Sequence, residues 1–485
     1  MVIDQYKDVE NGVVHGVEEL GIPFLENFKK VDDYEGEIDN AVEKGSIVMV
    51  LLSTFVAVCG SFEFGFCVGY SAPTQFAIRN ELDLSLAEFS MFGSIITIGA
   101  MVGAVSSGSI ADFVGRKGAM RMSACFCTIG WLAVYFSMAA WTLDVGRFFT
   151  GYGIGILSYV VPVFIAEIAP QNLRGGLTTI NQLLIVCGAS ASYLVGIVVT
   201  WRTLSLIGVI PCVFLLVGLV CIPESPRWLA KVGLSKEFQA ELRKLRGKDA
   251  DITQEAAEIQ AYVDTLQSLP KAKFMDLFGS KYIRSVIIGV GLMALQQLVG
   301  INGINFYATE IFVAAGLSGN EGTIAYAIIQ LPITVVGATL MDKSGRRALI
   351  MVAASGIFLG CFLTGGSFFL KEHGLLLEWV PLIAISGVLI YISSFSIGMG
   401  GVPWVIMSEI FPIHVKGVAG SFVVLVNWLC AWIVSFTFNF LLTWSSTSTF
   451  SIFAGFSIVT ILFVAKVVPE TKGKTLEQIQ VLINS

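Results

Sequence analysis

The chain has 485 residues, of which 55% are hydrophobic and only 14% are charged, and its mean hydropathy is +0.78. This balance excludes an ordinary soluble globular domain and predicts a protein embedded in a lipid bilayer. The net charge of -6 is concentrated in the ends and the middle of the chain, so it indicates solvated segments and not a nucleic-acid partner.

The first 46 residues are polar and acidic, with an acidic run between Asp32 and Asp39. They lack a charged segment followed by an apolar one, so we expect no cleavable signal peptide. We assign residues 1–46 to a disordered cytoplasmic tail, and the first membrane span then serves as the insertion signal.

Twelve stretches of about 20 mostly apolar residues follow, which is the length a helix needs to cross about 30 Å of hydrocarbon. They are predicted at 47–70, 89–110, 118–140, 143–166, 176–198, 203–222, 282–307, 323–341, 347–369, 379–403, 416–440 and 448–468. The sequence thus predicts an all-α membrane protein with a six-helix half at 47–222, a second at 282–468 and a tail at 469–485.

The polar segment 223–281 separates the two halves and has a helical charge pattern at Lys236–Arg246 and Gln254–Gln267. The short loops on the side of this segment hold eight Lys and Arg residues, and the opposite loops hold three. Both termini and the middle segment are therefore predicted to be cytoplasmic, and the middle segment to form a small helical linker bundle.

Three pairs of short motifs recur in the same order in the two halves. DFVGRK begins at Asp112 and DKSGRR at Asp342, EIAP begins at Glu167 and EIFP at Glu409, and PESPR is matched by PETKG. The order of the three pairs and their similar separations along the chain indicate that the second half repeats the first.

Acidic and basic residues gather at the predicted cytoplasmic helix ends. Anchoring of the topology explains the Arg and Lys residues but gives no reason for the acids. Alternatively, ion pairs and helix-end contacts bridge the two halves when the cytoplasmic side is closed. The candidates are Asp112, Arg116, Glu167, Arg174, Glu224, Arg227, Asp342, Arg346, Glu409 and Glu470.

The stretch QQLVGINGIN carries four carboxamides, namely Gln296, Gln297, Asn302 and Asn305. A carboxamide both donates and accepts hydrogen bonds, so it can bind hydroxyl groups without placing a charge in the bilayer. In a continuous helix Gln297, Asn302 and Asn305 share a face, and Gln296 lies about 100° around from Gln297. The alternative is that these amides only hold helices together.

Taken together, RFFTGYG, PVFIAEIAPQNLRGG, PESPRWL, QQLVGINGINFY, PETKG and the GRK/GRR loops resemble the sugar porter family of the major facilitator superfamily. The resemblance spans roughly residues 50–475. FGFCVGYSAP and VPWVIMSEIFP look most like plant early-responsive-to-dehydration-like monosaccharide transporters. The resemblance implies the major facilitator fold and further sugar-site residues, namely Gln182, Gln330, Trp404, Asn427 and Trp428. The flat faces of the two tryptophans suit the C–H side of a sugar ring.

Two positions depart from the family pattern. The usual GPxPW reads GGVPW, so Gly401 replaces a proline and the kink depends on Pro403. Cys67 stands where proton-coupled relatives carry an aspartate, and a thiol is a poor proton carrier at physiological pH. Glu63 lies one helical turn earlier; burial would favour its protonated form, whereas a partner such as Arg147 would favour the carboxylate. A proton site and a fixed ion-pair or pore-lining role both remain open.

We therefore expect an alternating-access transporter of monosaccharides, most simply hexoses such as glucose, working mainly by facilitated diffusion in the plasma or vacuolar membrane. The alternatives are a proton-coupled symporter using Glu63, a non-transporting sugar sensor and a membrane enzyme. Neither tail is large enough for a signalling domain, and His15, His373 and His414 lie near or outside the membrane ends. The nine cysteines lack the spacing of a metal site or disulfide framework, so no catalytic residue, metal or other cofactor is expected. The expected partners are the sugar, the bilayer and, in the symport alternative, protons.

Overall fold

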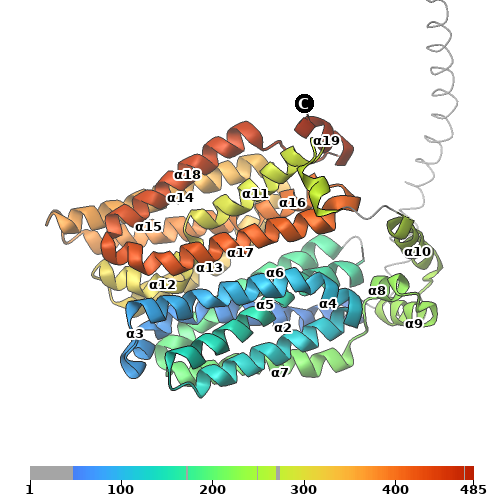
Figure 1. Ribbon diagram of the computed structural model, residues 1–485, viewed down its shortest axis with the longest axis horizontal. Coiled ribbons are helices and arrows are strands. Elements are labelled where there is room, and N and C mark those ends of the chain that lie inside the picture. Colours follow the sequence, from blue (N-terminus) through green and yellow to red (C-terminus); the bar gives the residue numbers. More distant parts are fainter. Residues whose placement is uncertain (1–46, 171–172, 248–249, 269–272, 475, 485) are drawn as a thin grey trace, which may run out of the picture.

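A computed structural model describes residues 47–170, 173–247, 250–268, 273–474 and 476–484, which form helices and no β-strand. The tail expected at residues 1–46 lies outside the described residues. Two bundles pack side by side (Figure 1), one from α2 to α7 and one from α11 to α18. Helices α8–α10 and α19 lie at the same end of both bundles, which we call the linker end. The opposite end, where α3 lies, is the far end.

The helices of the first bundle and of the linker follow the apolar and charged patterns of the sequence. The first bundle contains α2 Val48–Gly69, α3 Ser71–Leu82, α4 Leu86–Tyr135, α5 Ala140–Ile168, α6 Arg174–Val198 and α7 Trp201–Cys221. The linker contains α8 Pro226–Lys231, α9 Ser235–Arg246, α10 Thr253–Ser268 and a 3₁₀ turn at Phe274–Phe278. The short helix α3, between the first and second predicted spans, is not predicted from the sequence.

The second bundle contains two spans that are broken near their middle. Its elements are α11 Ile283–Leu298, α12 Ile301–Ala314, α13 Gly319–Lys343, α14 Arg346–Glu372, α15 Val380–Ser394, a π-helical turn at Phe395–Met399, α16 Val402–Ile410, α17 Ile413–Trp444 and α18 Ser446–Val467. Helix α19, Leu476–Asn484, follows at the linker end. The span expected as one helix at 282–307 is interrupted at Gly300, whose φ is 101°, and continues to Ala314.

Eleven described helical segments are long and apolar enough to cross a membrane, and the 50-residue α4 is one of them. Gly115 interrupts α4 with φ 81° and ψ 171°, a conformation available essentially to glycine alone. Counting the two arms of α4 separately changes eleven segments into the twelve crossings expected from the sequence.

The packing of α4 on α5 shows that the chain reverses at Gly115. In the first arm, Gly99 lies against Phe148 and Gly103 against Tyr152, so that arm runs parallel to α5. In the second arm, Ser123 donates a hydrogen bond to the Gly153 carbonyl at 2.7 Å, whereas the later Gly130 lies against Gly146. That arm therefore runs antiparallel to α5.

Glycines allow α2 and α6 to approach each other closely. A Cβ atom on Gly65 would overlap the carbonyl oxygen of Ile185, and one on Gly188 would overlap that of Phe62. Small residues at such crossings bring helix backbones together, which is how helices pack where lipid provides no hydrophobic driving force.

The two bundles touch toward the far end. The rings of Tyr193 and Tyr326 meet edge to face at 5.5 Å, and Ser190 Oγ donates to the Ala327 carbonyl at 3.1 Å. No ion pair or hydrogen bond among the described residues joins the bundles at the linker end. The structure is therefore closed at the far end.

We expect Gly115→Ala to destabilise the protein by about 1–3 kcal/mol, because an L-residue with this φ is strained. The added Cβ would also lie 2.6 Å from Glu224 Oε2. Thermal unfolding in detergent measures the effect. Gly366→Ala is the control, because Gly366 is helical and a Cβ there meets no atom within 4 Å. Equal melting temperatures for the two variants would contradict the strain argument.

Candidate functional site

Gln296 connects the two broken spans of the second bundle. Its side chain is 2% exposed, and Nε2 donates to the carbonyl oxygens of Met399 at 2.6 Å and Gly400 at 3.0 Å. Its Oε1 accepts from Asn427 Nδ2 at 3.0 Å. The amide therefore satisfies backbone groups where the helical pattern of the span is interrupted, which is the helix-holding role left open by the sequence.

Gln297 and Asn302 extend this set of amides across the break at Gly300. Asn302 Nδ2 donates to Gln297 Oε1 at 2.6 Å, and Gln297 Nε2 lies 3.4 Å from Gln296 Oε1. The break replaces the continuous helix on which their shared face was predicted, yet the two side chains still meet. We call Gln296, Gln297, Asn302 and Asn427 the amide cluster.

Asn305 lies at the contact between the bundles. Tyr326 donates to its Oδ1, and Tyr193 of the first bundle donates to its backbone oxygen at 2.8 Å. The two tyrosines are not predicted from the sequence, because no motif spacing marks them. Their hydroxyl groups make Asn305 part of the far-end closure.

The other residues expected at the sugar site make no described hydrogen bond to the amide cluster. Gln330 on α13 is 9% exposed, and its Oε1 makes no hydrogen bond. The Trp428 ring lies 6.4 Å from Phe64 of the first bundle, while Gln182 on α6 and Trp404 on α16 are exposed. Among the described residues, hydrogen bonds therefore join the members of the amide cluster, whereas these other candidates lie on elements of both bundles without such a bond to it.

Glu63 is buried in the first bundle, with an exposed fraction of 1%. Its Oε1 accepts from Trp131 Nε1 at 2.6 Å and from Cys67 Sγ at 3.1 Å. Arg147, considered as its partner, donates instead to the Cys67 carbonyl at 2.9 Å and to Ser71 Oγ. The described residues therefore contain no Glu63–Arg147 ion pair.

At the linker end of the first bundle, Arg116 is the centre of an ion-pair network. Its Nε and Nη2 atoms bind the two Glu167 oxygens at 2.8 and 2.7 Å, and Nη1 lies 3.2 Å from Asp112 Oδ1. Ser225 Oγ donates to Glu167 at 2.6 Å, and Lys231 pairs with Asp112 at 2.8 Å. The network joins α4 and α5 of the first bundle to α8 of the linker.

The equivalent network in the second bundle is weaker. Arg346 Nη2 lies 3.5 Å from Glu409 Oε1, and Arg346 Nε is buried without a hydrogen bond. Among the other gate candidates, Arg227 lies over the Tyr262 ring at 5.6 Å, and Arg174 Nε is buried without a hydrogen bond. The Asp342 side chain lies outside what the structure describes. Every described linker-end ion pair thus stays within one half or its linker.

Glu224 and Glu470 were expected among the ion pairs, but their carboxylates bind backbone N–H groups. Glu224 accepts from Lys117 N at 3.1 Å, and Glu470 accepts from Arg346 N at 2.9 Å and Arg347 N at 3.1 Å. Each carboxylate thus caps the helical segment that follows a repeated GR motif.

The two capping carboxylates differ in their electrostatic environment. Burial raises the pKa of Glu224, although the backbone N–H groups of Ser225 and Lys117 act against this shift. Burial also acts to raise the pKa of Glu470, but backbone N–H groups including that of Lys472 outweigh it and hold the pKa below its usual value. Glu470 is therefore the more firmly ionised of the pair.

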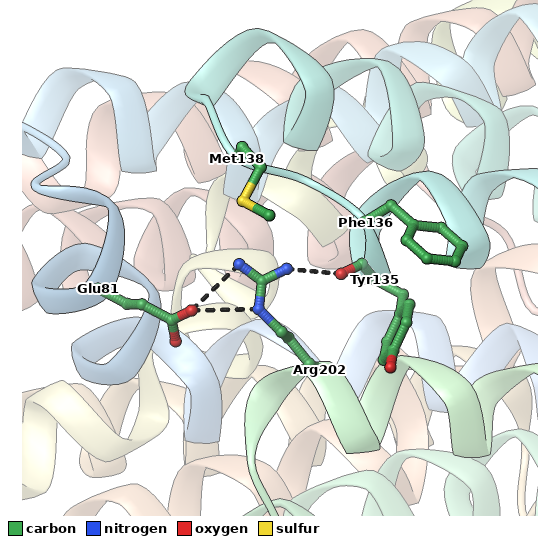
Figure 2. A pocket seen from close by; sticks show the side chains of 5 residues that line it. All are labelled: Glu81, Tyr135, Phe136, Met138 and Arg202. Atoms are coloured by element: carbon green, nitrogen blue, oxygen red, sulfur yellow. Dashed lines mark hydrogen bonds and ion pairs between the residues drawn. The ribbon is translucent and has the colours of Figure 1, made fainter.

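A separate pocket of about 410 Å³ opens at the far end of the first bundle (Figure 2). It is lined by Glu81, Tyr135, Phe136, Met138 and Arg202. Arg202 Nη2 pairs with Glu81 at 3.1 Å, and Nη1 donates to the Tyr135 carbonyl at 2.6 Å. None of the candidate site residues lines this pocket, so it is distinct from the amide cluster.

Two helical bundles, the second with two broken spans and buried amides at the breaks, are the architecture of a carrier of the major facilitator superfamily. The solved structure of the proton:xylose symporter XylE bound to 6-bromo-6-deoxy-D-glucose is similar, with a TM-score of 0.74, 28% identity and coverage of 90% of this chain and 99% of that chain. An inward-open structure of the xylose transporter XylE from E. coli has a TM-score of 0.76, 28% identity and coverage of 89% and 99%.

Residues 51–483 match the family described as "Sugar (and other) transporter", and the chain belongs to this family. Two similar relatives from Arabidopsis thaliana are Sugar transporter ERD6-like 16 and Sugar transporter ERD6-like 7. The first is 66% identical over 485 residues, covering 100% of this chain and 99% of the relative. The second is 59% identical over 436 residues, covering 90% and 94%. The family and fold predicted from the sequence motifs are confirmed.

We expect Arg116→Ala to destabilise the protein by about 3–5 kcal/mol, because it leaves the largely buried Glu167 carboxylate without its cation. Arg346→Ala should cost less than about 1 kcal/mol, because its single contact with Glu409 is long and more exposed. Lys231→Ala, which removes an exposed ion pair, is the control. Thermal unfolding in detergent measures all three, and a melting temperature of Arg116→Ala equal to that of Arg346→Ala would refute this ranking.

Proposed function

We propose that the protein carries monosaccharides, most simply hexoses such as glucose, across a membrane by alternating access and mainly by facilitated diffusion. The observation that carries this proposal is the uncharged amide cluster at the breaks of two spans. Amides bind sugar hydroxyls without the cost of a charge in the bilayer interior. The names of the Arabidopsis relatives and the sugar analogue bound to XylE support a sugar substrate.

In this proposal the linker end and both termini face the cytoplasm of a cell whose plasma or vacuolar membrane holds the protein. The excess of Lys and Arg in the linker-end loops supports this orientation. Closure at the far end then makes the present conformation inward-facing, in accord with the similarity to inward-open XylE. Sugar enters from the other side after the far-end contacts separate and the linker end closes.

Two side-chain pairs hold the far end closed in this scheme. Gln75 on α3 donates to Glu310 on α12, and Asn439 Nδ2 on α17 donates to Ser90 Oγ on α4 at 3.1 Å. Together with the Tyr193 and Ser190 contacts, these bonds must break in each transport cycle. The bonds are few and mostly uncharged, which suits a contact that opens repeatedly.

The residues at the first span support the proposal of facilitated diffusion. Cys67 occupies the position of the aspartate in proton-coupled relatives, and Glu63 lies one turn away and is turned toward Trp131. A buried Arg147 that binds a backbone carbonyl in place of a carboxylate gives no ion pair for a proton to break. Sugar movement is then driven by the sugar gradient alone.

We expect Gln297→Ala to weaken equilibrium sugar binding roughly tenfold or more, because two hydrogen bonds of about 1 kcal/mol each are lost. Binding of labelled glucose to the purified protein measures this change. Gln254→Ala, on the exposed face of α10, is the control and should bind as the unchanged protein does. Unchanged affinity in a stably folded Gln297→Ala variant would remove Gln297 from the site.

We expect a pH gradient imposed on sealed proteoliposomes, without a sugar gradient, to produce little or no accumulation of sugar. Counterflow exchange of labelled sugar in the same vesicles shows that the carrier is active. Accumulation severalfold above the outside level, abolished in Glu63→Gln while exchange is spared, would make the protein a proton-coupled symporter with Glu63 as its proton carrier.

A further inference from the structure

Three cysteines surround the Glu63 carboxylate, although they are far apart in the sequence. A carboxylate oxygen of Glu63 and the Sγ atoms of Cys127 and Cys212 all lie within 4.8 Å of one another. Cys67 Sγ is 3.1 Å from Glu63 Oε1. The side chains come from α2, the second arm of α4, and α7, which explains why the sequence shows no metal-site spacing.

The geometry points to a binding site for a thiophilic divalent cation of the Zn²⁺ and Cd²⁺ class, with Glu63, Cys127 and Cys212 as ligands. In a tetrahedral zinc centre with bonds of about 2.0 Å to oxygen and about 2.3 Å to sulfur, ligand atoms lie about 3.5–3.8 Å apart, and the three side chains would occupy three of its four positions. Separations of at most 4.8 Å therefore need only small side-chain rotations to close around the ion.

The polar surroundings of Glu63 leave one carboxylate oxygen available. Trp131 and Cys67 both donate to Oε1, which fixes the orientation of the carboxylate as an outer-shell partner does at a metal site. Oε2 is buried without a hydrogen bond of normal geometry, and the Cys212 thiol is close enough to act on the carboxylate. A cation bound by Oε2 and by the Cys212 sulfur would replace this thiol contact with coordinate bonds.

The charge of the first bundle also permits the ion to bind. Arg147 is fully buried, with no carboxylate partner, and it donates to the Cys67 carbonyl. A carboxylate and this guanidinium already balance each other. A divalent cation that replaces the thiol protons of Cys127 and Cys212 adds two positive and two negative charges, so the net charge of the interior does not change. The two protons leave to solvent.

The cluster belongs to one bundle and has no described contact with the amide cluster. All three ligating side chains are at most 1% exposed, so the ion is expected to enter while the protein folds and to be held as a structural ion. It would tie α2, α4 and α7 together without joining the two bundles. The inference therefore stands apart from the proposed sugar transport, and sugar binding reports on the latter independently.

The test uses the full-length protein produced in zinc-supplemented medium and purified in detergent without chelators. Elemental analysis should find about one zinc ion per chain, as for a single structural site. The double variant Cys127→Ser, Cys212→Ser should lose the zinc and show a lower melting temperature. Cys361→Ser is the matched control, because Cys361 is equally buried but lies alone in α14 of the second bundle, and it should keep the zinc.

Binding of cadmium provides a second measurement if the double variant does not fold. Cd²⁺ added during refolding or production should give an ultraviolet thiolate-to-metal absorption band, which Glu63→Gln should weaken and Cys361→Ser should leave intact. The inference is overturned if the protein from zinc-supplemented cells contains no zinc and the protein given Cd²⁺ shows no such band. Metal that persists unchanged in the double variant also overturns the inference, because that metal is then bound elsewhere.

Discussion

A backbone inside a bilayer must satisfy its own hydrogen bonds, and this constraint determines how the second bundle can contain two broken spans. The break at Gly300 and the π-helical turn at Phe395–Met399 lie beside each other because Gln296 bonds across them. The amide that satisfies Met399 and Gly400 also orients Asn427 and contacts Gln297. The two interrupted spans therefore share one connected set of buried amides at the place where the interruptions meet.

The repeated motifs make the same kinds of contact at the linker end of both halves, but the contacts of the first half are stronger. Glu224 and Glu470 each bring a carboxylate to the backbone after a GR motif, and a Cβ at Gly115 or Gly345 would meet that carboxylate. This explains the glycine in both copies, even though only Gly115 has a positive φ. The arginines have diverged further, since Arg116 makes paired bonds to its acid while the contact of Arg346 is single and long. The first half thus has the shorter and more numerous ion-pair contacts at the linker end.

Periodicity and composition predicted the twelve crossings and the helical linker, because both depend on local patterns of apolar and charged residues. Three features depended on contacts between distant segments. The continuous helix predicted around Gln297 breaks at Gly300, a residue that also suits a tightly packed helix. The ion pairs predicted for Glu224 and Glu470 are replaced by bonds to backbone N–H groups, which leave no trace in residue types. Tyr193 and Tyr326 hold Asn305, but no spacing could have separated them from other buried aromatic residues.

The interior of the first bundle shows how a carrier can keep two buried charged side chains without pairing them. Arg147 is held by a backbone carbonyl, a hydroxyl and the rings of Tyr70 and Phe92, each 5.2 Å from its guanidinium carbon. Glu63 is held by an indole and a thiol. A carboxylate at position 67 would lie one turn closer to Arg147 along α2, where gain or loss of a proton would make or break an ion pair. With cysteine there, the acid and the base are each satisfied by separate uncharged partners, and the sulfur atoms of three cysteines lie around the Glu63 carboxylate.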